Sequence, residues 1–239
     1  MTPDLSVVFP VYNEEQNIPV LLDEIGAALR GQPWSFEMVA VDDGSRDRSL
    51  EILRQSRSKY PNLRVLTFEK NSGQTAALDA AWRAARGKYV VSLDADLQND
   101  PADIPPMVRN LEESGADMVI GVRVNRQDTW ARKVQSRIGN GVRNWITGDR
   151  ITDTGCSLKL VKHEAIDRVS LYTGMHRFLP TLLRMRGYKV VEMPVNHRAR
   201  KFGVSKYGAM NRAVRGLVDC LAVRWMSKRT LNYRVKEEA

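Results

Sequence analysis

Two carboxylates and a carboxamide alternate along the segment YVVSLDADLQND, residues 89–100, directly after a run that is typical of a buried strand. Side chains two residues apart point to the same side of an extended chain, so Asp94, Asp96 and Gln98 are expected to lie together. Crowded carboxylates repel one another unless a cation compensates them. Their hard oxygen atoms suit Mg²⁺ or Mn²⁺, which bridge readily to substrate phosphates. The segment therefore predicts a metal site for a nucleoside diphosphate, or else it only ends a strand and caps the next helix.

Two further polar clusters also follow predicted strands. PVYNEE (10–15) comes after the first strand, and DDGSRD (42–47) comes after the second. In an open parallel sheet, ligands bind outside the carboxyl ends of the strands, near the point where the strand order reverses. We therefore expect the three clusters to meet at one edge of a sheet and to form the walls of one binding site.

The first 120 residues alternate between strand and helix patterns, which is typical of an α/β protein with a doubly wound, mostly parallel sheet flanked by helices. Ser72 is the expected N-cap of a helix that closes at Gly87. Strands are expected at 5–11, 36–43, 63–68, 89–94, 117–123 and 188–195, with another at the end of 152–161. Helices are expected at about 18–29, 47–59, 103–114, 130–146 and 176–186.

Residues 201–239 are expected to form a basic amphipathic helical appendage to a single domain that spans 1–200. Residues 198–239 hold 11 Lys/Arg and 3 Asp/Glu, so this part carries +8 of the net charge of +9. Seven apolar residues between about 207 and 228 share one helical face: Met210, Val214, Leu217, Val218, Leu221, Ala222 and Trp225. Such a helix can lie in a membrane interface that contains anionic headgroups, or it can pack on the core or on a second subunit. The pattern leaves both alternatives open.

The composition argues against several classes of protein. A chain of 239 residues with 43% hydrophobic residues is typical of a folded domain rather than a disordered chain. Two cysteines, Cys156 and Cys220, are too few for a disulfide framework and lack metal-ligand spacing. No signal-peptide pattern and no apolar stretch of about 18 residues is evident, so we expect a cytoplasmic protein without a spanning helix. The basic C-terminal part lacks interleaved aromatic residues, so nucleic acid is not an expected partner.

Five motifs in order carry a resemblance to a known family. PVYNEEQNI, VDDGSRDRS and DADLQNDP resemble the nucleotide-sugar site of the family 2 glycosyltransferases, which have the GT-A fold. TDTGCSLK (152–159) and RKFGVSKYG (200–208) are similar to the acceptor-side motifs of the polyprenyl-phosphate sugar transferases, the group that contains dolichol-phosphate mannose synthase and bacterial undecaprenyl-phosphate glycosyltransferases. The resemblance implies an inverting glycosyltransferase, dependent on Mg²⁺ or Mn²⁺, that moves a hexose from a GDP- or UDP-linked sugar to a polyprenyl phosphate.

The resemblance also implies roles for individual residues. The nucleotide-sugar site would contain Pro10, Tyr12, Glu14, Val41, Asp43, Asp94, Ala95, Asp96 and Arg123. The metal ligands would be Asp94, Asp96 and Gln98, and the acceptor phosphate would contact Arg200, Ser205 and Lys206. Asp94, Asp96, Arg123 and Arg200 would be the catalytic residues, because they would hold the metal and stabilise the charge of the leaving diphosphate.

The sequence alone leaves two questions open: the class of acceptor and the way in which the protein reaches the membrane. A phosphate monoester, with a second pKa of about 6, is largely ionised at neutral pH, so we assign no general base. Many lipid-phosphate transferases of this group continue into transmembrane helices. We expect the basic amphipathic helix, or a separate membrane partner protein, to bring this chain to the cytoplasmic face of the membrane. The alternative is a soluble family 2 transferase that acts on a hydroxyl of a glycan or small molecule.

Overall fold

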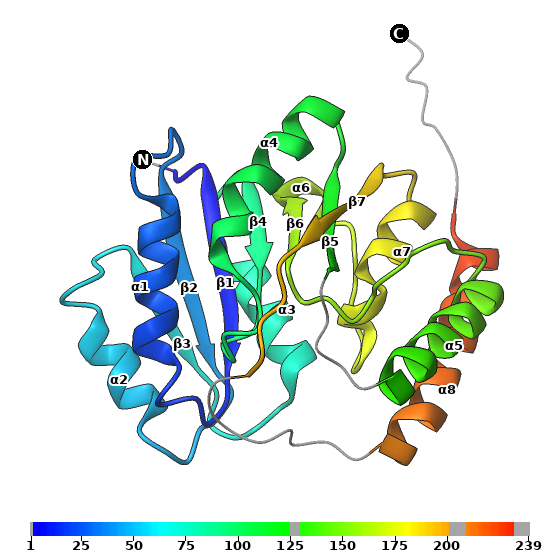
Figure 1. Cartoon of the computed structure of the whole chain (residues 1–239), viewed down its shortest axis with the longest axis horizontal. Helices are drawn as coiled ribbons and strands as arrows, with labels where there is room; N and C mark the ends of the chain where they lie inside the picture. The colour runs from blue at the N-terminus through cyan, green and yellow to red at the C-terminus, as the bar shows by residue number, and fades with distance from the viewer. Residues whose placement is uncertain (1, 125–129, 201–208, 232–239) are drawn as a thin grey trace, which may run out of the picture.

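A seven-stranded sheet runs through the molecule in the order β3-β2-β1-β4-β6-β5-β7 (Figure 1). The computed structural model describes residues 2–124, 130–200 and 209–231. The strands are β1 (Leu5–Val11), β2 (Phe36–Asp42), β3 (Leu63–Thr67), β4 (Tyr89–Ser92), β5 (Met118–Arg123), β6 (Lys159–Lys162) and β7 (Val190–Val195). The helices are α1 (Ile18–Leu29), α2 (Ser49–Ser56), α3 (Gln74–Ala84), α4 (Ile104–Ser114), α5 (Trp130–Thr147), α6 (His163–Ile166), α7 (Leu179–Met185) and α8 (Ala209–Arg229), with short 3₁₀ turns η1 (Pro101–Asp103) and η2 (Met175–Phe178).

The sheet is doubly wound and mostly parallel, as the alternation of strand and helix patterns predicts. β1 pairs in parallel with β2 and β4, β2 pairs in parallel with β3, and β5 pairs in parallel with β7. β6 is antiparallel to both of its neighbours, β4 and β5. The chain winds outward from β1 to β3 and then returns to place β4 on the other side of β1. The strand order therefore reverses between β1 and β4, which is where an open α/β sheet is expected to bind its ligand.

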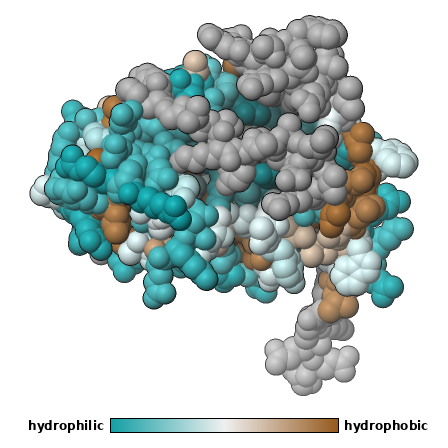
Figure 2. All heavy atoms as spheres, turned by 90° about the horizontal axis from the view of Figure 1, so that it is seen from below, coloured by the Kyte–Doolittle hydropathy of each residue, from teal (hydrophilic) through white to brown (hydrophobic). Residues whose placement is uncertain are grey.

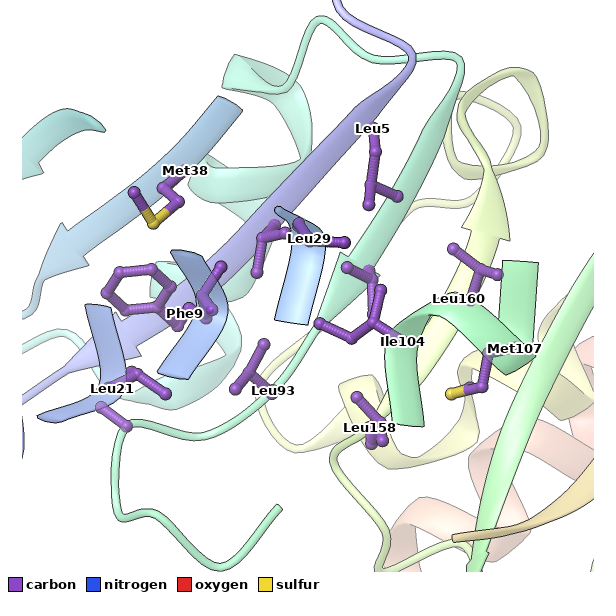
Figure 3. Packing of buried hydrophobic residues seen from close by; sticks show 14 of the residues in the cluster. Leu5, Phe9, Leu21, Leu29, Met38, Leu93, Ile104, Met107, Leu158 and Leu160 are labelled. Atoms are coloured by element: carbon purple, nitrogen blue, oxygen red, sulfur yellow. The ribbon is translucent and has the colours of Figure 1, made fainter. Parts of the chain in front are cut away.

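Helices cover both faces of the sheet because the central strands are apolar on both sides. On one face, Leu5 and Phe9 of β1 pack with residues of α1 and α4, among them Leu21 and Ile104 (Figure 3). On the other face, Val8 of the same strand belongs to a second cluster that includes residues of α3, α7 and α8. Successive side chains of β1 thus point into the cores on opposite faces of the sheet, as the two-residue period of a strand requires.

Two local details differ from the expectations. The N-cap of α3 is Gly73, with a φ of +93°, rather than Ser72, because the backbone N–H groups of both residues donate to Asp43. β4 ends at Ser92, so Asp94 and Asp96 do not lie on an extended strand. Residues 95–97 form a turn and bend in which Leu97 adopts a φ of +61°. A turn, and not the alternation of a strand, therefore positions the two carboxylates.

The C-terminal helix α8 packs on α5 and on the second core. Cys220 and Val223 are buried in that cluster, and Arg224 donates from Nη1 to the carbonyl oxygen of Ile146 at 2.7 Å. Other apolar side chains of α8 remain exposed: Leu217, Val218, Leu221 and Trp225. In the part of the chain that the structure describes, no helix combines the length and apolar character needed to cross a membrane.

Candidate active site

A cavity of about 620 Å³ lies where the carboxyl ends of the parallel strands meet. It is lined from the three predicted clusters by Pro10, Tyr12, Glu14, Asp43, Asp94, Ala95, Asp96 and Gln98, and from later segments by Arg123 and Arg200. These carboxyl ends form the lower edge of the sheet in Figure 1, onto which Figure 2 looks. The structure therefore brings together residues that are up to 190 positions apart in the sequence.

The first two motifs hold one another by hydrogen bonds between their loops. Ser45 Oγ accepts from the backbone N–H of Asn13 at 3.0 Å, and Ser49 Oγ accepts from that of Glu14 at 2.8 Å. Asp47 Oδ2 accepts from the backbone N–H of Glu15 at 3.2 Å. The polar residues of DGSRDRS therefore fix the backbone that presents Tyr12 and Glu14 to the cavity. Sequence reasoning noticed this motif but did not foresee its supporting role.

Gly44 is required by the close approach of the loop that follows β3. Its φ is +68°, and a Cβ there would lie 2.6 Å from the backbone carbon of Lys70. Next to it, the Asp43 carboxylate accepts from Asn71 Nδ2 at 2.9 Å and from the backbone N–H of Ser72 at 2.6 Å. Burial raises the pKa of Asp43 despite these backbone donors. Val41, by contrast, is fully buried in the second core and does not line the cavity.

The DADLQ turn is braced on both sides. Gln74 Nε2, at the start of α3, donates to Asp94 Oδ1 at 2.8 Å, and Asp96 Oδ1 accepts from the backbone N–H of Gln98 at 3.1 Å. Burial and the neighbouring Asp96 charge raise the pKa of Asp94 to about 6. A divalent cation would relieve this repulsion, and the oxygen donors present fit a hard ion.

The residues that could hold such a cation are Asp94, Asp96 and Gln98. Among the described residues, no group of three or more His, Cys, Asp or Glu side chains could hold a metal ion. The two carboxylates and the carboxamide are of the type that suits Mg²⁺ or Mn²⁺, which often take only one or two carboxylates from the protein and complete their shell with water and substrate phosphates.

Arg200 lies directly on the DADLQ turn. Its Nη2 is 2.6 Å from Asp96 Oδ2, so the guanidinium neutralises one of the two crowded carboxylates. The chain before it is tied to the same region: Arg198 bridges Glu24 and Asp100 at 2.7 and 2.6 Å. These pairs position Arg200, and Arg198 is a supporting residue that sequence reasoning missed. Ser205 and Lys206, the other two predicted acceptor residues, lie outside the described residues.

Arg123, at the end of β5, is held by a two-point ion pair with Asp153. The Nε–Oδ2 and Nη2–Oδ1 distances are 2.7 and 2.8 Å. Gly155, two residues after Asp153, leaves space for the guanidinium, because a Cβ on Gly155 would lie 2.7 Å from Arg123 Nη2. The TDTGCSLK motif therefore orients the arginine that precedes it in the chain.

Lys159, His176 and Arg177 line the cavity and had no individual role in the sequence interpretation. Lys159 is buried and donates to the carbonyl oxygen of Cys156, and burial lowers its pKa. It belongs to TDTGCSLK, so the motif itself was the available signal. His176 and Arg177 also line the cavity from η2, and no motif in the sequence pointed to them.

Comparisons with known proteins agree with this geometry. The family model described as glycosyl transferase family 2 matches residues 6–172. The dodecaprenyl-phosphate galacturonate synthase of Rhizobium johnstonii is 41% identical over 228 residues, which are 92% of this chain and 66% of that protein. The undecaprenyl-phosphate 4-deoxy-4-formamido-L-arabinose transferase of Edwardsiella ictaluri is 38% identical, over 91% of this chain and 67% of that protein. The chain thus spans about two thirds of the length of these relatives.

Solved structures share the fold at lower identity. A mannosyltransferase from Pyrobaculum calidifontis, in complex with GDP-Man and Mn²⁺, aligns with a TM-score of 0.67 at 23% identity, over 98% of this chain and 66% of that one. Glucosyl-3-phosphoglycerate synthase from Mycobacterium tuberculosis, in complex with Mn²⁺, UDP and phosphoglyceric acid, aligns with a TM-score of 0.70 at 21% identity, over 92% and 78% of the two chains. These neighbours show the GT-A fold. Because the family model matches residues 6–172, which are more than half of this chain, the chain belongs to glycosyl transferase family 2.

Proposed function

We propose that this protein transfers a sugar from a nucleoside-diphosphate donor to a polyprenyl phosphate, with inversion at the anomeric carbon. The observation that carries the proposal is one cavity that combines the Asp94–Asp96 turn with the cationic side chains of Arg123, Lys159 and Arg200. Such a cavity suits a reaction between two phosphate-bearing substrates. The names of the relatives, which act on dodecaprenyl and undecaprenyl phosphates, support the same acceptor class.

The donor would occupy the half of the cavity formed by the first three motifs. Pro10, Tyr12, Glu14 and Asp43 would contact the base and ribose, and Ala95 lies between the two carboxylates that would face the diphosphate. Val41 would contribute only from the core, by supporting Asp43. Arg200 would exchange part of its contact with Asp96 for the diphosphate when the donor binds.

The transfer needs one bond to form and one to break. An oxygen of the acceptor phosphate attacks the anomeric carbon, and the bond from this carbon to the diphosphate breaks, with the electron pair leaving on the nucleoside diphosphate. Arg123 and Arg200 would stabilise the charge that develops on the leaving group. A bound Mg²⁺ or Mn²⁺, held by Asp94, Asp96 and Gln98, would add Lewis-acid stabilisation of the same charge.

A phosphate acceptor and a hydroxyl acceptor place different demands on the cavity carboxylates. A hydroxyl acceptor needs a general base, whereas a phosphate is already ionised. Each of the five carboxylates that line the cavity has a partner: Asn17 for Glu14, Asn71 for Asp43, Gln74 for Asp94, Arg200 for Asp96 and Arg123 for Asp153. Three of these partners are neutral amides, which leave a carboxylate able to accept a proton, so the preference for a phosphate acceptor rests on the names of the relatives.

The helix pair α5–α8 supports peripheral binding to an anionic membrane surface, and we place the protein at its cytoplasmic face. Trp145 of α5 and Trp225 of α8 are 81% and 63% exposed, and Leu221 is 53% exposed. Figure 2 shows apolar side chains gathered on the side of the molecule where α5 and α8 lie in Figure 1, while the opposite side is mostly hydrophilic. Lys228 and Arg229 follow in the last turn of α8. Exposed aromatic and leucine side chains next to cations are typical of a helix that binds at the headgroup level.

The transferase activity can be tested with the full chain and labelled nucleotide sugars. The protein would be incubated with Mn²⁺, each of a panel of UDP- and GDP-linked sugars, and liposomes that contain undecaprenyl phosphate. We expect label from one donor in the organic phase, and none when undecaprenol replaces the phosphate. Water-soluble glycan acceptors, assayed in parallel, would collect the label if the alternative is correct.

The Asp96→Asn variant is the control for the donor site. It keeps the shape of the side chain but removes the charge that pairs with Arg200, so transfer should fall by at least about 100-fold. No lipid-linked label with any donor, in a protein that still binds UDP or GDP in the presence of Mn²⁺, would refute the polyprenyl-phosphate acceptor.

A further inference from the structure

Two neighbouring side chains of η2 line the cavity without any part in the mechanism above. His176 and Arg177 lie in the same short turn, and the cavity residues described so far come from other elements. One of the two is a buried polar ring and the other is an exposed cation. Their contacts show what kind of group they can bind.

The ring of His176 is fixed by a hydroxyl on α3. Thr75 Oγ1 lies 2.7 Å from His176 Nδ1, and the same oxygen accepts from the backbone N–H of Gly174 at 2.9 Å. Within the described chain, the Thr75 hydroxyl has no acceptor other than Nδ1, and it is buried. Its proton therefore goes to Nδ1, which places the imidazole proton on Nε2.

His176 is only 9% exposed, yet it lines the cavity. The described contacts of its ring involve Nδ1. Burial and the positive charges of Lys159 and Arg177 lower the pKa of His176 to about 3, so the ring is neutral at physiological pH. The cavity thus contains a rigid, neutral hydrogen-bond donor that no described residue uses.

Arg177 differs from the other arginines of the cavity in its pairing. Arg123 pairs with Asp153 and Arg200 pairs with Asp96, whereas Arg177 has no ion-pair partner among the residues that the structure describes. A guanidinium without a carboxylate partner, next to a fixed N–H donor, matches the oxygens of a phosphate or a carboxylate.

The turn that carries both residues is held in place before any ligand binds. Gly174, the N-cap of η2, has a φ of +87°, a region that favours glycine. A Cβ at this position would lie 2.9 Å from a carboxylate oxygen of Asp219 on α8. Because Gly174 donates to Thr75 on one side and approaches α8 on the other, the donor group of His176 is preorganised.

We propose that His176 Nε2–H and Arg177 form an oxyanion subsite of the active site, which binds a substrate anion other than the donor diphosphate. This inference rests on the proposed function. The shared chemistry is a phosphate or carboxylate group, which is the phosphate of the lipid acceptor or the carboxylate of an acidic donor sugar. The subsite would hold that anionic group in the same cavity as the Asp94–Asp96 turn. Substrates without the anion would bind more weakly, because they would leave the Arg177 guanidinium and the His176 N–H group without an acceptor.

Equilibrium binding to the full chain tests the subsite without the need for turnover. The first arm compares farnesyl phosphate with farnesol, and the second compares UDP-glucuronic acid with UDP-glucose in the presence of Mn²⁺. The Arg177→Gln variant should weaken binding of the anionic member of one arm by at least about tenfold and leave its neutral counterpart unchanged. The arm that responds identifies the source of the anion. Arg168→Gln, which removes an exposed charge that does not line the cavity, should have no effect in either arm.

The histidine is tested by a pair of variants. His176→Phe removes the N–H donor and should weaken the same anion, while His176→Gln keeps a donor and should restore part of the affinity. Two results would overturn the inference. One is that Arg177→Gln binds each of the four probes as tightly as wild type does. The other is that wild-type protein binds neither anionic probe more tightly than its neutral counterpart. UDP and GDP binding with Mn²⁺ is the separate readout of the donor site, so its loss would count against the proposed function and not against the subsite.

Discussion

The Arg123–Asp153 ion pair allows a quantitative test of how the arginine at the end of β5 is positioned. Its two contacts, at 2.7 and 2.8 Å, join side chains that are 17% and 6% exposed. Asp153→Asn keeps the shape of the side chain but replaces the carboxylate opposite the guanidinium with a neutral amide. Breaking a fully buried pair in this way costs about 3–5 kcal/mol, and the partial exposure of Arg123 reduces the expected cost to about 2–3 kcal/mol.

Urea unfolding of a double-mutant cycle measures this cost directly. The set would comprise wild type, Asp153→Asn, Arg123→Gln and the double variant. Because each single variant already removes the interaction between the two charges, the double variant should be less destabilised than the sum of the two singles by at least about 1 kcal/mol. Transfer activity should fall in Asp153→Asn as well, since Arg123 would lose its fixed orientation toward the leaving group.

Two results would refute this reasoning. If the two single variants are additive, the pair does not act as a unit. If Asp153→Asn is as stable as wild type, Arg123 finds another partner and Asp153 does not position it.

The remaining predictions concern pH, packing and the membrane. His176 has a pKa of about 3 in the folded protein, against about 6.5 for an unfolded histidine. Its neutral form therefore stabilises the fold above about pH 6.5, and this contribution is lost as the pH falls toward about 3. His176→Gln should lose less stability than wild type between these pH values, and parallel pH profiles of the two proteins would contradict the assignment. Gly121→Ala should destabilise by about 1–3 kcal/mol in urea unfolding, because its Cβ would lie 2.7 Å from Val195 Cγ2. Gly141→Ala in α5, where the Cβ would meet nothing within 4 Å, is the matched control and should be neutral or stabilising. Leu221→Asp should reduce sedimentation with anionic liposomes while nucleotide binding persists, and unchanged sedimentation would rule out α8 as the contact surface.

Most of the sheet could be predicted from local patterns. The apolar runs before PVYNEE and DDGSRD become β1 and β2, and the helices expected at 18–29 and 103–114 appear within a residue of those bounds. The signals were strong because both elements bury a complete face, which leaves a clear periodicity. The end of β4 was harder, because the same residues fit an extended strand or a turn until the positive φ of Leu97 is known.

Pairings between distant segments could not be read from the sequence. His176 falls in a predicted helix, and nothing in its neighbours indicates that Thr75, 101 residues earlier, fixes its tautomer. The direction of β6 was equally hidden, since an apolar strand has the same composition whether it runs parallel or antiparallel to its neighbours. The exposure of Leu221 was left open for the same reason, because an amphipathic pattern gives the faces of a helix and not the surface that each face meets.

The sequence by itself determined the strand-end clusters, their acidic chemistry and the family resemblance, because these depend on residue type and short-range spacing. Only the tertiary structure decided which charges in the cavity are already neutralised. Arg200 and Arg123 have carboxylate partners, and among the described residues that line the cavity Arg177 is the arginine without one. The physical reason is that ion pairing depends on distances of a few ångströms between side chains that the chain brings together only when the sheet reverses its order between β1 and β4.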